Sequence, residues 1–344
     1  MDKKQDPKKD KITHKNYSIS KYDLFFISLY IIAFIAGLVL SVKSKKYNLS
    51  LREQNPNYYY PTLLEIIINT AILTFILLIA KISVEKILFQ FTEIILVDKY
   101  KKNEFKHEKE KAKRKMTIYG VKFFHYLIIT IVSYFVFNKL EFFPKELFGN
   151  GDMNKLYYKG IESFSFFERP KYFEFHYLFN LAYTFADLIC VVFINDRQTD
   201  ILVVLFHHFC TISLILFSYY NHCDGIGAII VFIHNASDII SYLARTFLYV
   251  VAPSIIKKVL TVILLINWLY SRQFLLGKVI YGIFVNITWE SFGIIESFKF
   301  LLIGLYILHC YWLYKLIQIV YNGVKGKFID STEFTKDKKN KKII

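Results

Sequence analysis

The sequence contains few cysteines, and no two of them have the CxxC spacing of a metal or redox site. The 344 residues include four, Cys190, Cys210, Cys223 and Cys310, and each lies in or beside an apolar block. We therefore expect neither a zinc site nor a disulfide framework, but small apolar side chains packed between helices. Internal repeats and low-complexity stretches are also missing, which argues against a repeat protein.

Long apolar blocks dominate the chain: 54% of the residues are hydrophobic and 18% aromatic, against about 45–50% apolar residues in a typical soluble domain. Each block is long enough to cross a ~30 Å hydrocarbon layer as a helix, and none alternates like a barrel strand. The blocks cover residues 24–42, 62–80, 120–138, 173–194, 201–220, 225–249, 258–281 and 297–321. The pattern predicts an all-α integral membrane protein with about 7–8 transmembrane helices, the seventh block being interrupted by Arg272.

The formal charge of +16 comes from 44 Lys and Arg residues against 28 Asp and Glu residues. No RNA- or DNA-binding motif accompanies it, so we expect no nucleic acid as a partner and interpret the charge through membrane orientation. Basic residues crowd residues 99–115 and 323–344, and both segments are therefore predicted to be cytosolic. An even number of spans places the N-terminus there too. One loop disagrees, because its basic residues would then be luminal: Lys43, Lys45, Lys46 and Arg52.

These features divide the chain into segments. Residues 1–23 form a basic cytosolic tail without the features of a removable signal peptide, and residues 24–98 carry N-terminal transmembrane helices. Residues 99–115 form a charged cytosolic segment, and residues 323–344 a basic cytosolic tail. The chain ends in Lys341-Lys342-Ile343-Ile344, which is similar to the di-lysine signal of endoplasmic reticulum membrane proteins, although a frayed basic tail is the alternative.

Three histidines and two aspartates gather in neighbouring apolar blocks. His207 and His208 are adjacent, His234 and Asp238 are four residues apart, and Asp200 precedes His207 by two helical turns. Ionisable residues at membrane depth are costly and usually face a cavity or one another. The turn between the two blocks is short, so the two helices should be antiparallel neighbours. We therefore expect these imidazoles to converge on one interior pocket.

Such a pocket suits acyl transfer. An imidazole can take a proton from an amine or attack a thioester itself, and a carboxylate on its second nitrogen would fix the tautomer. Two alternatives remain open. The polar groups can simply join the helices by hydrogen bonds. Alternatively, a single zinc ion can be held by His207, His208, His234 and Asp238, although the spacing does not require a metal and we expect none.

The stretch from Asp196 to Tyr249 resembles the LAG motif of TLC-domain ceramide synthases through RQTD, LFHHFCTISLILFSYY and GIGAIIVFIHNASDI. The resemblance is most convincing over residues 172–249. It implies a six-helix TLC domain, which we assign to residues 116–322, around a pocket that opens toward the cytosol. It also implies an enzyme that transfers the acyl group of acyl-CoA to the amine of a sphingoid base, with no separate cofactor.

The resemblance also implies roles for single residues. His207 and His208 would be the acyl acceptor or general base, and His234 and Asp238 would complete the catalytic set. Substrate-binding roles would fall to residues at the mouth and beside the second motif: Asp200, Arg197, Asn235 and Arg245. We expect basic groups at the mouth to receive the phosphates of coenzyme A, with Arg197, Arg245, Lys257 and Lys258 as candidates.

The chain departs from the family pattern at three positions. Asn235 stands in place of the aspartate of an HD pair, and Tyr242 and Asn180 stand where many members have glutamate. If the missing carboxylate matters, Asn235→Asp should raise activity. The alternative function is a non-enzymatic TLC protein, such as a TRAM-like translocon or lipid-binding factor. Beyond the bilayer and the two substrates, a homo- or heterodimer is a possible assembly.

Overall fold

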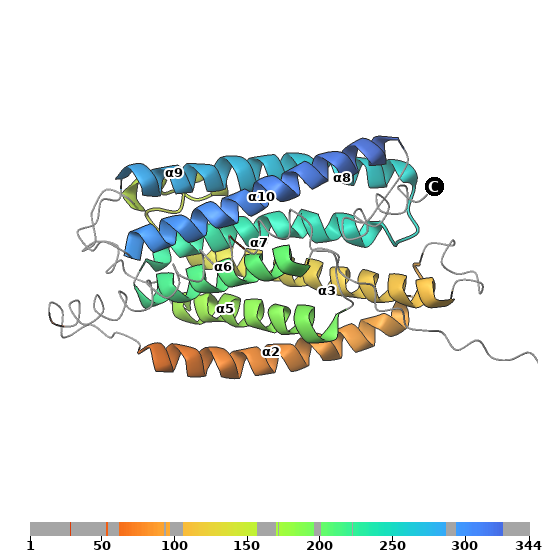
Figure 1. Cartoon of the computed structure of the whole chain (residues 1–344), viewed down its shortest axis with the longest axis horizontal. Helices are drawn as coiled ribbons and strands as arrows, with labels where there is room; N and C mark the ends of the chain where they lie inside the picture. Colours follow the sequence, from red (N-terminus) through yellow and green to blue (C-terminus); the bar gives the residue numbers. More distant parts are fainter. Residues whose placement is uncertain are drawn as a thin grey trace, which may run out of the picture.

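The computed structural model describes residues 28, 53, 62–92, 94–96, 106–156, 170, 172–195, 201–221, 223–286 and 294–325. Its helices carry the labels of Figure 1. They are α2 (Leu63–Phe91), α3 (Lys106–Phe137), α5 (Phe173–Ile189), α6 (Ile201–Tyr220), α7 (Asp224–Phe247), α8 (Ser254–Trp268), α9 (Leu276–Asn286) and α10 (Ile294–Val324). Two short 3-10 helices follow α3, η3 (Lys145–Leu147) and η4 (Met153–Leu156). Two π-helical turns, η5 (Cys190–Ile194) and η6 (Leu269–Leu275), extend α5 and join α8 to α9.

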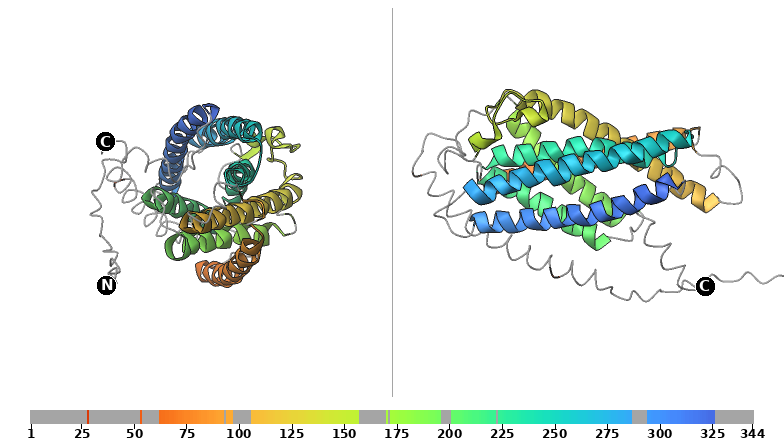
Figure 2. Two further views of the ribbon diagram at one scale, coloured as in Figure 1. Left: turned by 90° about the vertical axis from the view of Figure 1, so that its right-hand side faces the viewer. Right: turned by 90° about the horizontal axis from the view of Figure 1, so that it is seen from above.

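The helices from α3 onward form a closed ring. Around it, α3 packs against α5, α5 against α6, α6 against α10, α10 against α8, and α8 against α7, which returns to α3. Helix α2 lies outside the ring against α5 and α3, as the end-on view shows (Figure 2). The six-membered ring agrees with the helical bundle that the resemblance implies, with α2 added to it.

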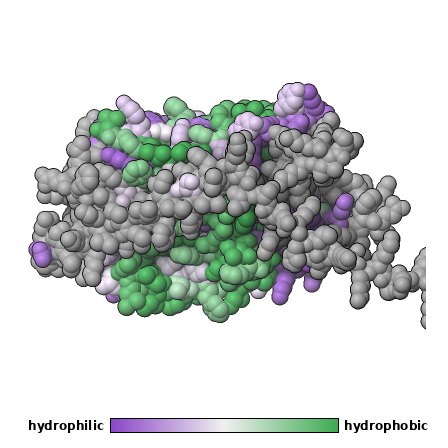
Figure 3. Space-filling model, viewed as in Figure 1, coloured by the Kyte–Doolittle hydropathy of each residue, from purple (hydrophilic) through white to green (hydrophobic). Residues whose placement is uncertain are grey.

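The outer faces of the helices are apolar. Within the described residues, seven helical segments are long and apolar enough to cross a membrane: Leu63–Phe91, Glu108–Phe137, Phe173–Ile194, Ile201–Tyr220, Asp224–Phe247, Ser254–Asn286 and Ser297–Asn322. Large apolar side chains such as Leu64 and Phe75 of α2 are exposed, and Figure 3 shows hydrophobic surface where α2 lies. Exposed apolar surface of this extent belongs in lipid rather than in water. The chain is an all-α, multi-pass membrane protein.

Seven of the eight predicted spans are confirmed, and the first, residues 24–42, lies outside the described residues. The uncertain block around Arg272 is one helical rod over residues 254–286, in which η6 joins α8 to α9. Helix α3 begins at Lys106, so the described part of the charged segment 99–115 is the start of a spanning helix. At the start of α2, Thr62 and Glu65 form a reciprocal capping box.

The turn between α6 and α7 determines how the two histidine-bearing helices align. Cys223 donates its backbone N–H to the Ser218 carbonyl at 2.7 Å, which closes the turn. One turn into α7, Gly227 lies so close to α5 and α6 that a β-carbon there would be 1.8 Å from the Tyr177 hydroxyl. Only glycine fits this approach. The tight contact holds α6 and α7 side by side, as predicted.

Candidate functional site: a histidine-lined cavity

A cavity of about 870 Å³ lies inside the ring. Helices α2, α3, α5, α6, α7, α8 and α10 and the turn η6 all contribute to its walls. Basic side chains line the end at which α3 begins and α7 and α10 finish, among them Lys86, Arg114, Lys115, Arg245 and Lys315. Apolar side chains line the opposite end, among them Leu214, Ile215, Ile230 and Leu305. The cavity therefore offers a charged entrance and an apolar interior.

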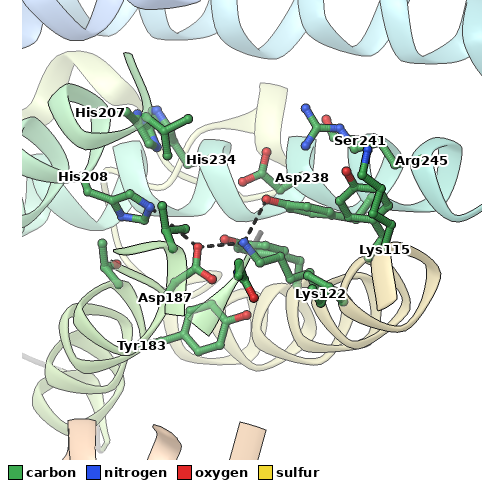
Figure 4. Close-up of a pocket in the computed structure, with 18 of the residues that line it drawn as sticks. Lys115, Lys122, Tyr183, Asp187, His207, His208, His234, Asp238, Ser241 and Arg245 are labelled. Carbon is green, nitrogen blue, oxygen red and sulfur yellow. Dashed lines mark hydrogen bonds and ion pairs between the residues drawn. The ribbon is translucent and has the colours of Figure 1, made fainter. Parts of the chain in front are cut away.

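Four imidazoles meet beside this cavity. His207, His208 and His234 line it together, as Figure 4 shows. The ring centroid of His207 lies 5.7 Å from that of His208 and 6.3 Å from that of His309 on α10. His309 in turn lies 5.1 Å from His234, ring to ring. The predicted convergence of the three histidines is confirmed, and His309 joins them.

Hydrogen bonds fix the protonation pattern of the His234–His309 pair. Nδ1 of His234 lies 2.7 Å from the carbonyl oxygen of Ile230, so this nitrogen carries a proton and donates it. Nε2 of His234 lies 3.0 Å from Nε2 of His309. In the neutral pair, His309 must therefore donate and His234 must accept. Since both ring nitrogens of His234 are engaged in hydrogen bonds, the His207–His208 pair on α6 is better placed to act on a substrate.

Asp238 bonds an arginine rather than the histidine one turn before it. The guanidinium of Arg272 donates to Asp238 Oδ1 at 2.6 Å, to the Ser237 hydroxyl at 2.5 Å and to the His234 carbonyl at 3.0 Å. Arg272 is only 2% exposed, and its guanidinium also lies over the Trp268 ring. Asp238 lines the cavity as predicted, but its carboxylate pairs with Arg272 rather than with His234, and Arg272 also bonds the carbonyl of His234.

The two asparagines that stand where the family resemblance implies carboxylates, Asn180 and Asn235, hydrogen-bond each other. The Asn235 amide donates to Asn180 Oδ1 at 2.9 Å, and the Asn180 amide lies 3.1 Å from His176 Nε2 and donates to the His176 carbonyl at 2.8 Å. His176 Nε2 also lies 2.8 Å from the Ser133 hydroxyl. The network joins α3, α5 and α7 through neutral groups. Two carboxylates at these positions would face each other, whereas two amides match as donor and acceptor.

A buried ion cluster supplies a carboxylate that the sequence interpretation did not include. Asp187 of α5 accepts from Lys81 of α2 at 2.5 Å and from Lys122 of α3 at 2.7 Å, one lysine on each oxygen. Its Oδ2 also lies 3.7 Å from Nε2 of His208. Figure 4 shows Asp187 between Lys122 and His208. The Lys122 ammonium further lies 3.5 Å from the Tyr242 hydroxyl, where the family resemblance would place a glutamate.

The remaining predicted residues divide into two groups. Arg245 lies at the basic end of the cavity, with its guanidinium over the rings of Tyr119 and Tyr242. The other two mouth candidates on the next helix, Lys257 and Lys258, do not line the cavity. Arg197 and Asp200 lie outside the described residues. The charged mouth is therefore built by α2, α3, α7 and α10 rather than by α8.

The zinc alternative lacks two of its four ligands. Both nitrogens of His234 are engaged by Ile230 and His309, and Asp238 is engaged by Arg272. Within the described ranges, no group of three or more His, Cys, Asp or Glu side chains is arranged to hold a metal ion. The cavity presents imidazoles beside a carboxylate fixed by lysines, which is a donor set for proton transfer and nucleophilic attack.

Comparison with known proteins identifies the family of the chain. A sequence model of the TLC domain matches residues 115–318, which include the paired histidines and the ring of helices apart from the start of α3 and the end of α10. The chain belongs to the TLC domain family. The match begins after α2, so Lys81 lies outside the family domain even though its ammonium bonds Asp187 inside it.

Curated relatives of this TLC protein are named sphingosine N-acyltransferase or ceramide synthase. The chain is 27% identical to sphingosine N-acyltransferase lac1 of Schizosaccharomyces pombe over 176 residues, 47% of this chain and 45% of the relative. It is 28% identical to ceramide synthase 5 of Homo sapiens over 162 residues, 44% of this chain and 39% of the relative. It is 24% identical to ceramide synthase LOH1 of Arabidopsis thaliana over 163 residues, 45% of this chain and 52% of the relative. The matched stretches thus cover about half the length of these relatives or less.

Sequence reasoning missed four residues of this TLC site: Lys81, Lys122, Asp187 and His309. Each is an ionisable side chain inside or at the end of an apolar block, which is by itself a signal of a functional position in a membrane protein. That signal was available in the sequence. The pairing was not, because Lys81 and Asp187 are 106 residues apart and on helices that are not consecutive.

Proposed function

We propose that this TLC protein is a ceramide synthase, which transfers a fatty acyl group from acyl-CoA to the amine of a sphingoid base. The observation that carries the proposal is the position of the His207–His208 pair inside a cavity with a basic entrance and an apolar interior. The names of the relatives support the same reaction, and they do not favour the non-enzymatic alternative.

The residues at the cavity account for each chemical requirement of this reaction. The C–S bond of the thioester breaks, a C–N amide bond forms, the amine loses a proton, and coenzyme A leaves as the thiol. An imidazole of the α6 pair takes the amine proton directly, or first accepts the acyl group and then passes it to the amine. His207 is only partly buried, whereas His208 is buried beside Asp187, so we assign the substrate-facing role to His207.

The two ends of the cavity suit the two parts of acyl-CoA. The phosphates would lie at the basic end, near Arg114, Lys115, Arg245 and Lys315, and the acyl chain would lie among the apolar side chains of the interior. No cofactor other than the substrate is required. We also propose that the basic end faces the cytosol, that both termini are cytosolic, and that the protein resides in the endoplasmic reticulum membrane, where it can form dimers.

This proposal can be tested in microsomes that carry the protein and are supplied with acyl-CoA and a labelled sphingoid base. We expect labelled ceramide from the wild type and none from the double variant His207→Ala plus His208→Ala. Cys210→Ala is the matched control, because Cys210 lies on the same helix but faces Gly304 of α10 rather than the cavity. Equal ceramide from the wild type and the double variant would refute the proposal.

A further inference from the structure

The ion cluster around Asp187 joins four helices beside the histidine pair. Four helices contribute one side chain each, and all four are nearly inaccessible: Lys81 is 5% exposed, Lys122 6%, Asp187 5% and His208 6%. We propose that Asp187 is a positioning residue that sets the orientation and tautomer of His208, and that Lys81 of α2 and Lys122 of α3 hold its carboxylate in place. The catalytic consequence rests on the proposed acyltransferase function.

The two lysines make Asp187 a fixed anion. Each carboxylate oxygen accepts from a separate ammonium group, Oδ1 from Lys81 and Oδ2 from Lys122. Two charge-assisted bonds oppose protonation of the carboxylate and restrict its rotation. Asp187 therefore does not serve as a general base. What it can do is present a negative oxygen to its third neighbour, His208.

That oxygen determines which nitrogen of His208 carries the proton. Asp187 Oδ2 lies 3.7 Å from Nε2, so a neutral His208 is more stable with its proton on Nε2, facing the carboxylate, than with a lone pair there. Nδ1 then carries the lone pair, and it has no hydrogen-bond partner among the described residues. A rigid His208 in one tautomer gives its neighbour His207, whose ring is 5.7 Å away, a constant electrostatic environment.

Lys81 extends the site beyond the matched domain. The match to the TLC family begins at residue 115, whereas α2 ends at Phe91. A polar contact between α2 and α5 does not require a charge, because Thr74 already donates to the Ala182 carbonyl at 3.3 Å. Burying a charged pair is costly and is weak evidence of a stabilising role. A lysine that reaches across to the carboxylate beside the histidine pair is better explained by the site.

The test separates charge balance from positioning. Asp187→Asn alone leaves two buried lysines without their anion, and this variant can fail to fold. Asp187→Asn combined with Lys81→Met removes one charge of each sign, so the net charge of the cluster is unchanged. For this double variant, purified in nanodiscs, we expect wild-type KM for acyl-CoA but roughly 10- to 100-fold lower kcat. Lys81→Arg should keep near-normal kcat, and Thr74→Val, the control on the same helix, should leave it unchanged.

A second readout does not depend on activity. Nitrogen-15 histidine NMR distinguishes the two tautomers, and a His208→Gln variant assigns the His208 signals. We expect the Nε2-protonated form in the wild type and a mixture in the double variant. Unchanged kcat, or identical His208 signals in the two proteins, would overturn the positioning role. If the wild type makes no ceramide, the proposed function fails, and the NMR comparison alone decides on Asp187.

Discussion

Removing Arg272 should destabilise the protein because of the charge that it leaves behind. The guanidinium makes hydrogen bonds to Asp238, Ser237 and the His234 carbonyl, so it ties η6 to the middle of α7. Arg272→Met keeps an unbranched side chain at this position and removes all three bonds. Breaking a buried pair by removing one partner typically costs about 3–5 kcal/mol. The Asp238 side chain is 22% exposed, so the lower end of that range, about 3 kcal/mol, is expected.

A double-mutant cycle isolates this contribution. Asp238→Asn alone leaves the arginine without its anion, whereas Arg272→Met plus Asp238→Asn removes both charges. If the pair is coupled as the distances indicate, the double variant should lose about 2 kcal/mol less than the sum of the two single variants. Unfolding in mixed micelles, followed by circular dichroism, gives the free energies. Strict additivity within about 0.5 kcal/mol would refute the reasoning, because it would mean that the two side chains act independently.

Two further predictions follow from hydrogen bonding and packing. Asn235→Asp should lower both the stability of the protein and its ceramide formation, contrary to the expectation from the family pattern. The new carboxylate would face Asn180 Oδ1, and a hydrogen bond worth about 1 kcal/mol would be lost. Increased ceramide formation in the microsomal assay would contradict this. Gly227→Ala should destabilise the folded protein by about 1–3 kcal/mol, because the added β-carbon would lie 1.8 Å from the Tyr177 hydroxyl. An additional Tyr177→Phe change should restore part of the lost stability in the same unfolding assay.

The fold was largely predictable because lipid allows few solutions. Apolar blocks of sufficient length must be helices in a bilayer, and the spans around His207 and His234 agree with the structure to within a few residues. The block containing Arg272 was harder to assign, because hydropathy treats a charged residue as an interruption. In the structure the arginine points inward and finds three partners, so the helical rod continues through it.

The candidate site was predictable only along single helices. The spacing of His234 and Asp238 correctly places both on the cavity wall, but spacing cannot show that Arg272, 34 residues later, bonds the aspartate. Similarly, Asn180 and Asn235 each looked like a lost carboxylate when considered alone. Their hydrogen bond across 55 residues joins the two positions, which the sequence alone did not indicate. Contacts between helices that are distant in sequence depend on the order of the ring, which hydropathy does not encode.

The π-helical turn at Leu269–Leu275 gives Arg272 its direction. Each residue of a regular α-helix advances about 100° around the axis, so the wider turn changes the angular phase between α8 and α9. Losing one residue here would restore regular winding and rotate one half of the rod relative to the other. Either the arginine would then swing out of the cavity or α9 would present a different face to α10. Among distant relatives, we therefore expect a single-residue gap at this turn to accompany a change either in the contact between the arginine and Asp238 or in the face that α9 presents to α10.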